Sequence, residues 1–173
     1  GINVAYLIGT WIDIMFFGDC DFYTRYKKSL VEWPNLKVSC CMSFKNNSFI
    51  KYLERDVFHS NGITSKINSV SWNNSSGAAA ISLAAHLGAK RILLLGFDMN
   101  FNFEGERHWH NSYKRPQMSS KKITPFEKHL EPFPEIAKDA ESIGIEIINL
   151  NPKSKIEVFP KYSLEEYLTE YKN

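Results

Sequence analysis

The chain has 173 residues, a formal net charge of +2 at pH 7 and a pI near 8.4. A single domain of this length can bury a sizeable core, and so balanced a charge gives no reason to expect a nucleic-acid partner. No apolar run is long enough to span a membrane and no signal peptide is visible, so we expect a cytoplasmic protein. Three cysteines without C-x-x-C spacing indicate a reducing compartment and no structural zinc.

The first part of the chain alternates apolar strand patterns with one helical pattern. Two apolar runs precede a Gly18-Asp19 turn, and aromatic residues at helical spacing follow it. The predicted elements are, in order, a strand over Gly1–Ile8, a strand over Ile12–Phe17, a helix over Phe22–Leu30, a strand over Leu36–Met42, and a polar excursion over 45–70 with a short strand at Phe49–Leu53.

The stretch from Ser71 to His110 carries the clearest structural pattern of the chain, a helix followed by a strand. Its polar run Asn73–Gly77 is typical of a helix cap, and the apolar residues that follow predict a buried helix ending at Gly88. Lys90–Gly96 is an almost continuous apolar run, which predicts a strand covered on both faces. We therefore expect this run to be the central strand of a sheet.

The last part of the chain predicts two more helical regions and one strand. The helical pattern over Phe126–Ile143 must be interrupted near Pro132 and Pro134. A strand over Ile145–Leu150 follows, and Ser163 with Glu166 forms a capping box for a final helix. Strands that alternate with helices predict one α/β domain over 1–173, with a Rossmann-like, doubly wound, mostly parallel sheet and a flexible lid loop at about 99–125.

Ligands of open parallel sheets collect at the carboxyl ends of strands and at helix N-termini. The cap residues Ser75, Ser76 and Gly77 offer hydroxyl and amide groups to a phosphate, and Asp98 follows the predicted central strand. We therefore predict a phosphorylated ligand between this cap and the loop after Asp98. The alternative is that Ser75 or Ser76 only caps the helix.

The loop after Asp98 carries His108, His110 and Tyr113. A histidine with a pKa near neutrality suits the removal of a proton from an acceptor hydroxyl, and a tyrosine hydroxyl can hold a leaving phosphate. The two histidines could instead chelate a metal with Asp98 or Glu106, although H-x-H alone is a weak zinc pattern. They could also be packed or exposed residues without chemistry.

These motifs together resemble a known family. An S-S-G turn that opens an Ala-rich helix, the pattern L-G-A-K-R-I-L-L-L-G-F-D and the H-W-H loop look like the bacterial sialyltransferases that use CMP-activated sialic acid. They also resemble phage-encoded Rossmann-like proteins of unassigned activity and the related pterin diphosphokinase-like proteins. The similarity is clear over Ser75 to Asp98 and in the H-W-H motif.

The resemblance implies a donor site. Asn3 matches an asparagine that holds the nucleotide sugar in those sialyltransferases, and Asp19 replaces a second asparagine of that pattern. Ser76, with Ser75 adjacent, corresponds to the serine before the Ala-rich helix. The family's opening G-x-G-P-S loop, which cradles the donor phosphate, has no counterpart in the printed residues.

The resemblance also implies a general base. In the family this base is a histidine in a mobile lid, and only His108 or His110 can fill that role here. We prefer His110 because it lies closer to Tyr113 along the chain. The implied activity is transfer from a CMP-sugar donor to a glycan acceptor, with no cofactor. Two alternatives are a Mg²⁺-dependent diphosphokinase using Asp19 and Asp98, and a non-catalytic, phage-type nucleotide-binding protein.

Overall fold

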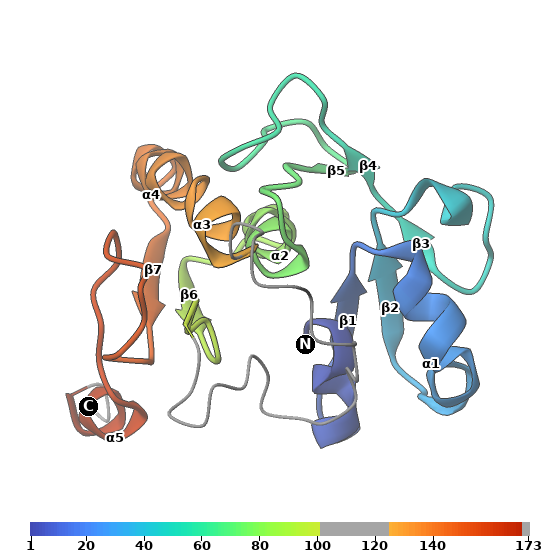
Figure 1. Cartoon of the computed structure of the whole chain (residues 1–173), viewed down its shortest axis with the longest axis horizontal. Coiled ribbons are helices and arrows are strands. Elements are labelled where there is room, and N and C mark those ends of the chain that lie inside the picture. The colour runs from blue at the N-terminus through green and yellow to red at the C-terminus, as the bar shows by residue number, and fades with distance from the viewer. Residues whose placement is uncertain (101–124, 171–173) are drawn as a thin grey trace, which may run out of the picture.

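The computed structural model describes residues 1–100 and 125–170, which form a mixed α/β structure of short parallel strands and connecting helices (Figure 1). The described strands make three small sheets, of three, two and two strands. No helix within the described ranges is long and apolar enough to cross a membrane. The α/β class and the parallel strand direction agree with the sequence prediction, and the sheets are smaller than predicted.

The first sheet and its helix comprise β1 (Ile14–Phe17), α1 (Cys20–Glu32), β2 (Leu36–Ser39) and β3 (Lys51–Tyr52). The three strands are parallel, in the order β1, β2, β3, with Ile14 opposite Leu36 and Val38 opposite Lys51. Helix α1 is the crossover that joins two neighbouring parallel strands. It buries Phe22 in a core that also contains Phe17, at the end of β1.

The beginning of the chain differs from the predicted strand. Ile2 makes one parallel bridge to Phe16, and the chain then turns into a 3₁₀ helix, η1 (Asn3–Ile8). Asn3 has a φ of +51°, a conformation that interrupts extended backbone. The predicted strand over Gly1–Ile8 is therefore wrong beyond Ile2, because the turn at Asn3 leads into a 3₁₀ helix that buries Val4 and Tyr6 in the same core as Phe22 of α1.

The second sheet pairs β4 (Glu54–Arg55) with β5 (Ser69–Val70) in parallel. Its connection to the first sheet is nearly continuous, because the Leu53 amide donates to the Ser39 carbonyl and the Glu54 amide donates to the Asn68 carbonyl. A second 3₁₀ turn, η2 (Met42–Phe44), lies in the segment between β2 and β3. The predicted excursion thus contains three short strands, of which β3 pairs with β2 and β4 pairs with β5, and a long loop between β4 and β5.

The third sheet pairs β6 (Arg91–Leu94) with β7 (Glu146–Asn149), with Arg91 opposite Glu146. Helices α3 (Pro125–Leu130) and α4 (Phe133–Ser142) lie between these strands in the chain, separated where Pro132 and Pro134 predicted an interruption. The last helix, α5 (Leu164–Glu170), begins with the predicted capping box: the Ser163 amide donates to Glu166, and the Glu166 amide donates to the Ser163 hydroxyl.

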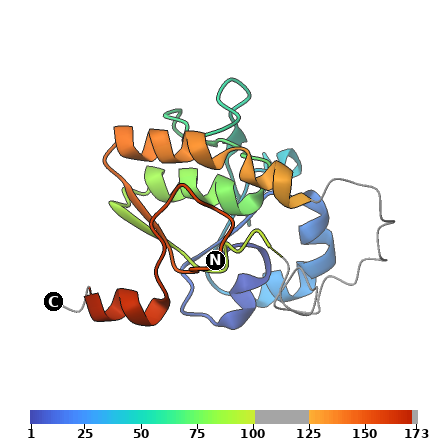
Figure 2. The same ribbon diagram turned by 60° about the vertical axis from the view of Figure 1, so that its left-hand side comes forward.

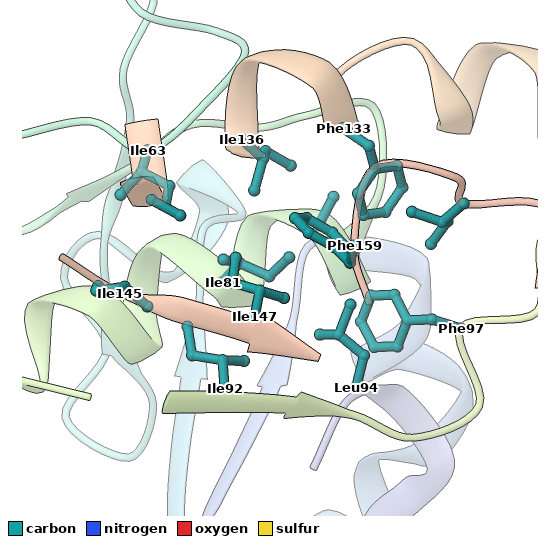
Figure 3. Packing of buried hydrophobic residues seen from close by; sticks show 13 residues of the cluster. Ile63, Ile81, Ile92, Leu94, Phe97, Phe133, Ile136, Ile145, Ile147 and Phe159 are labelled. Atoms are coloured by element: carbon teal, nitrogen blue, oxygen red, sulfur yellow. The ribbon is translucent and has the colours of Figure 1, made fainter. Parts of the chain in front are cut away.

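Helix α2 (Ser76–His86) packs against two hydrophobic cores. Ala79 joins Phe16 and Val70 in one core, whereas Ile81 joins residues of β6, β7 and α4 in another. Figure 2 shows α3 and α4 running along α2, and Figure 3 shows Ile81 close to Ile147 within the larger core. The nearly all-apolar composition of α2 follows from this double contact, as the sequence predicted.

Strand β6 differs from its prediction. Ile92 and Leu94 are buried, but Leu93 is 38% exposed and Leu95, just after the strand, is 64% exposed. Among the described residues β6 pairs with β7 alone. The prediction of a central strand covered on both faces is therefore wrong, because a continuous apolar run does not by itself show that both faces are covered.

The cysteines also differ from expectation. Cys20, the first residue of α1, forms a disulfide with Cys41, with a Cα–Cα distance of 5.5 Å. Cys40 is a free, buried thiol whose pKa is raised by burial, and the nearby Arg55 partly opposes that rise. The expectation from a reducing compartment, three free cysteines, is wrong for Cys20 and Cys41. The fold brings them together because α1 begins directly after β1, and Cys41 lies just after the neighbouring strand β2.

Candidate functional site

The turn before α2 is held by buried polar contacts. The Asn73 side chain is fully buried, accepts from the Gly62 amide at 2.7 Å and donates to the Gly62 carbonyl at 2.9 Å. Asn73 and Asn74 both have positive φ, near +52° and +57°, which directs the chain into the helix. The polar run that predicted a cap therefore also fixes the position of the helix N-terminus.

The two serines of the turn bind the protein itself. The Ser75 hydroxyl accepts from the Ala78 amide at 3.1 Å and is the N-cap of α2, so the helix-cap interpretation is confirmed for Ser75. The Ser76 hydroxyl accepts from the Gly18 amide at 3.0 Å and links α2 to the end of β1. Neither hydroxyl donates a hydrogen bond to another residue of 1–100 or 125–170, which leaves each hydroxyl hydrogen for a ligand acceptor.

The first turn of α2 leaves two amides open. The Ser75 hydroxyl accepts a hydrogen bond from the Ala78 amide, and the Ser75 carbonyl accepts one from the Ala79 amide. No described residue accepts from the amides of Ser76 or Gly77. Free amides at a helix N-terminus, together with the helix dipole, favour an anion.

Gly77 packs closely against the Phe97 ring. A Cβ atom at Gly77 would lie 3.1 Å from the Phe97 ring, closer than an ordinary contact. From the sequence we expected Gly77 to serve a phosphate through its amide group. The structure shows a packing role as well, because Phe97 follows β6 and covers the side of α2.

Arg55, at the end of β4, joins three segments near Ser76. Its Nη2 donates to the Gly18 carbonyl at 2.6 Å, and its Nε donates to the Cys40 carbonyl at 3.2 Å. The guanidinium carbon lies 3.7 Å from the centroid of the Trp72 ring. We call Arg55, Gly18, Trp72 and Ser76 the Arg55 cluster. The sequence analysis missed Arg55 and Trp72, which no local motif identifies.

Asp19 and His129 also lie near the turn that precedes α2. Asp19 is exposed at the N-cap position of α1, and its side chain makes no capping hydrogen bond. Burial lowers the pKa of His129, Lys128 lowers it further, and the Asp19 carboxylate opposes that shift. The Asn74 side chain donates to the Lys128 carbonyl at 3.3 Å, which places the end of α3 against the turn. His129 was overlooked in the sequence because only the fold brings it here.

Two polar atoms at the strand ends have no partner among the described residues. The Asn3 Oδ1 atom is buried just after the Ile2–Phe16 bridge, beside β1. The Ser71 hydroxyl is fully buried just after β5 and immediately before Trp72. Buried polar atoms are nearly always hydrogen-bonded in proteins, so these two atoms mark unmade hydrogen bonds at this end of the strands.

Asp98 makes hydrogen bonds to the loop that follows β7. Its carboxylate accepts from the Asn151 side chain, and its carbonyl accepts from the Lys155 amide at 3.0 Å. The preceding carbonyl, of Phe97, accepts from Asn149 at 3.3 Å and from Ser154 at 2.6 Å. These contacts tie the loop after β6 to the loop after β7, and they occupy part of the carboxylate that the sequence assigned to a ligand.

The predicted base and lid lie outside the described residues. His108, His110 and Tyr113 fall within 101–124, so their predicted roles are not tested. Within the described ranges, no group of three or more His, Cys, Asp or Glu side chains could hold a metal ion. The structure therefore places Asp19, Ser76 and Gly77 around one helix N-terminus, and it leaves the proposed base as a prediction.

No protein-family model matches this chain, and neither does any curated protein or solved structure.

Proposed function

We propose that this chain is a Rossmann-like, nucleotide-sugar-dependent glycosyltransferase of sialyltransferase type, whose donor phosphate binds at the N-terminus of α2. The observation that carries the proposal is the pair of open amides at Ser76 and Gly77, next to the hydroxyls of Ser75 and Ser76. Such a site binds phosphate without a metal ion.

Other residues of the same region supply contacts to the rest of the donor. The buried Oδ1 of Asn3 can accept from the amino group of a cytosine or from a sugar hydroxyl. Asp19 can accept from a donor hydroxyl, because its carboxylate is exposed at the start of α1. These roles follow from hydrogen-bond chemistry and agree with the resemblance described above.

The transfer step needs a base for the acceptor hydroxyl. We assign this role to His110, with His108 as the alternative and Tyr113 as a phosphate contact. A positioned base of this kind typically accelerates proton removal by about a hundredfold to ten-thousandfold. The test is the rate of sugar transfer to a glycan acceptor by the His108→Ala and His110→Ala chains. Near-native rates in both would remove histidine from the mechanism.

Donor binding can be tested without any substitution. We expect CMP, added to ¹⁵N-labelled protein, to shift the amide resonances of Ser76 and Gly77 saturably, because the phosphate would accept from both groups. Cytidine, which lacks the phosphate, is the matched control and should leave these two resonances nearly unchanged. If CMP produces no saturable shift anywhere in the spectrum, the proposal fails.

The exposed Asp19 carboxylate also fits a Mg²⁺-dependent diphosphokinase, which would hold its metal through carboxylates and nucleotide phosphates. Titration with ATP in the presence and absence of Mg²⁺ separates the two activities. Binding of ATP that depends on Mg²⁺, without binding of CMP, would favour the diphosphokinase. Binding of CMP without any transfer activity would favour a non-catalytic nucleotide-binding protein.

A further inference from the structure

Arg55 has an unusual environment for a surface cation. Its guanidinium donates to two main-chain carbonyls, those of Gly18 and Cys40, and stacks on the Trp72 ring. A guanidinium has five N–H groups, and these two contacts use only the Nε and one Nη2 hydrogen. The guanidinium also interacts with the Cys40 thiol, whose pKa it lowers against the larger effect of burial, and Nη1 makes no hydrogen bond to a main-chain group of the described residues. The side chain is thus held in place while part of its donor capacity is unused.

The charge of Arg55 is not neutralised by its neighbours in the chain. The Glu54 carboxylate lies 2.9 Å from the Lys66 ammonium. The Asp56 carboxylate accepts from the Thr64 hydroxyl at 2.5 Å and from the amides of Phe58 and His59. No carboxylate among the described residues forms an ion pair with Arg55.

The Arg55 guanidinium is close to the open amides of α2. Gly18 separates the two: its carbonyl accepts from Arg55, and its amide donates to the Ser76 hydroxyl. The Trp72 ring packs directly against Gly18, since a Cβ atom at Gly18 would lie 2.1 Å from that ring. A positive charge held on the Trp72 ring and the first turn of α2 are thus both bound to Gly18.

We propose that Arg55 binds the anionic group of the ligand, and that this group is the phosphate of the nucleotide donor. This inference rests on the proposed function. Planar guanidinium groups bind phosphate through paired N–H donors, and Trp72 restricts the guanidinium to one plane. The alternative is that Arg55 has only a structural role. It would then donate to the Gly18 and Cys40 carbonyls in the same way, but ligand affinity would not depend on its charge.

The first test uses wild-type protein, Arg55→Gln and Arg55→Lys, each titrated calorimetrically with CMP and with inorganic pyrophosphate. We expect Arg55→Gln to weaken both affinities at least tenfold, and Arg55→Lys to weaken them less, because lysine keeps the charge and loses the planar fork. Lys66→Gln is the control, since it removes a nearby exposed cation whose partner is Glu54. It should change neither affinity by more than about twofold.

The outcomes separate this inference from the proposed function. Wild-type affinities in Arg55→Gln would overturn the role of Arg55 and leave the nucleotide proposal intact. Binding of pyrophosphate but not CMP by the wild type, lost in Arg55→Gln, would support the anion site and overturn the nucleotide proposal. Binding of neither ligand by the wild type would overturn both.

A second measurement covers the case in which the Arg55 variants do not fold. Phenylglyoxal modifies exposed arginines of the wild-type protein, and mass spectrometry of peptides reports each site separately. We expect pyrophosphate to slow modification of Arg55 at least fivefold and to leave Arg25, an exposed residue of α1, unchanged. Equal modification of Arg55 with and without pyrophosphate would overturn the inference.

Discussion

The strand ends on the two sides of α2 use their polar groups differently. After β6 and β7, the Phe97 carbonyl accepts two hydrogen bonds, and the Asp98 carboxylate accepts one from Asn151. After β1 and β5, the Arg55 cluster also connects distant segments, but the amides of Ser76 and Gly77 and the Asn3 Oδ1 atom have no partner among the described residues.

This difference indicates which side can accept a ligand. On the β6–β7 side, the Phe97 carbonyl and the Asp98 carboxylate already accept hydrogen bonds from the protein. A ligand would have to displace these hydrogen bonds at a net cost in free energy. On the β1–β5 side, the same kind of backbone framework leaves donors and one acceptor open. Changes on the first side should therefore reduce stability, whereas changes on the second should reduce binding.

The largest expected effect is on the β6–β7 side. Phe133 is 1% exposed, and its ring centroid lies 6.5 Å from that of Phe97 and 6.0 Å from that of Phe159. Phe133→Ala should lower the free energy of unfolding by about 3–5 kcal/mol, because it leaves a cavity in the core. Urea denaturation measures the change. Phe133→Leu, the control, should lose less, and a loss under about 1 kcal/mol in Phe133→Ala would contradict the packing described here.

Gly18→Ala tests the β1–β5 side. The added methyl group would collide with Trp72 and disturb the ring on which Arg55 stacks. We expect a destabilisation of about 1–3 kcal/mol, typical of overpacking, and a loss of CMP affinity larger than that of any stability-matched variant. Gly88→Ala is the matched control, since it strains a residue with a φ of +84° in open space, just beyond the C-terminal end of α2. Equal CMP affinity in both variants would show that the Trp72 position does not matter for binding.

Much of the fold could be predicted because its elements have local causes. Helix α2 was predictable from its polar cap and apolar body, and the boundary between α3 and α4 from Pro132 and Pro134. The turn at Asn3 was not, because a positive φ at a single asparagine leaves no periodic pattern. Nor was the exposure of Leu93, since the number of neighbouring strands depends on the topology.

The site was predictable only in part. Ser76 and Gly77 could be found because they open an Ala-rich helix that precedes a strand, a local arrangement with a known use. Arg55 could not, because its contact with Gly18 joins residues 37 positions apart and depends on the pairing of β4 with β5. His129 belongs to α3, more than one hundred residues after Asp19 in the chain. Its position in the sequence therefore does not indicate that it lies near Asp19.

A smaller effect is expected from removing helix caps on the two sides. Ser75→Ala and Ser163→Ala each delete a hydroxyl that accepts from a backbone amide in the first turn of a helix. Each should cost about 1 kcal/mol in the free energy of unfolding. Only Ser75→Ala should also weaken CMP binding, because only its helix faces the proposed phosphate. Equal effects of both substitutions on CMP affinity would contradict this assignment.

The smallest expected effect concerns the protonation of His129. Burial and Lys128 lower its pKa in the folded protein, and Asp19 only partly offsets them. Because the unfolded chain then binds the proton more tightly, the contribution of neutral His129 to stability is complete above the unfolded pKa of about 6.5 and is lost as the pH falls towards the folded pKa. His129→Gln should therefore reduce the loss of stability between about pH 7.5 and pH 5.5, measured by urea denaturation. The control is His86→Gln, an exposed position at the end of α2, which should leave that pH dependence unchanged. An NMR titration of His129 with a midpoint above about 6.5 would contradict the prediction. The effect of the Asp19 carboxylate on the His129 pKa would then be larger than that of burial, and the β1–β5 side would be more strongly anionic than the structure indicates.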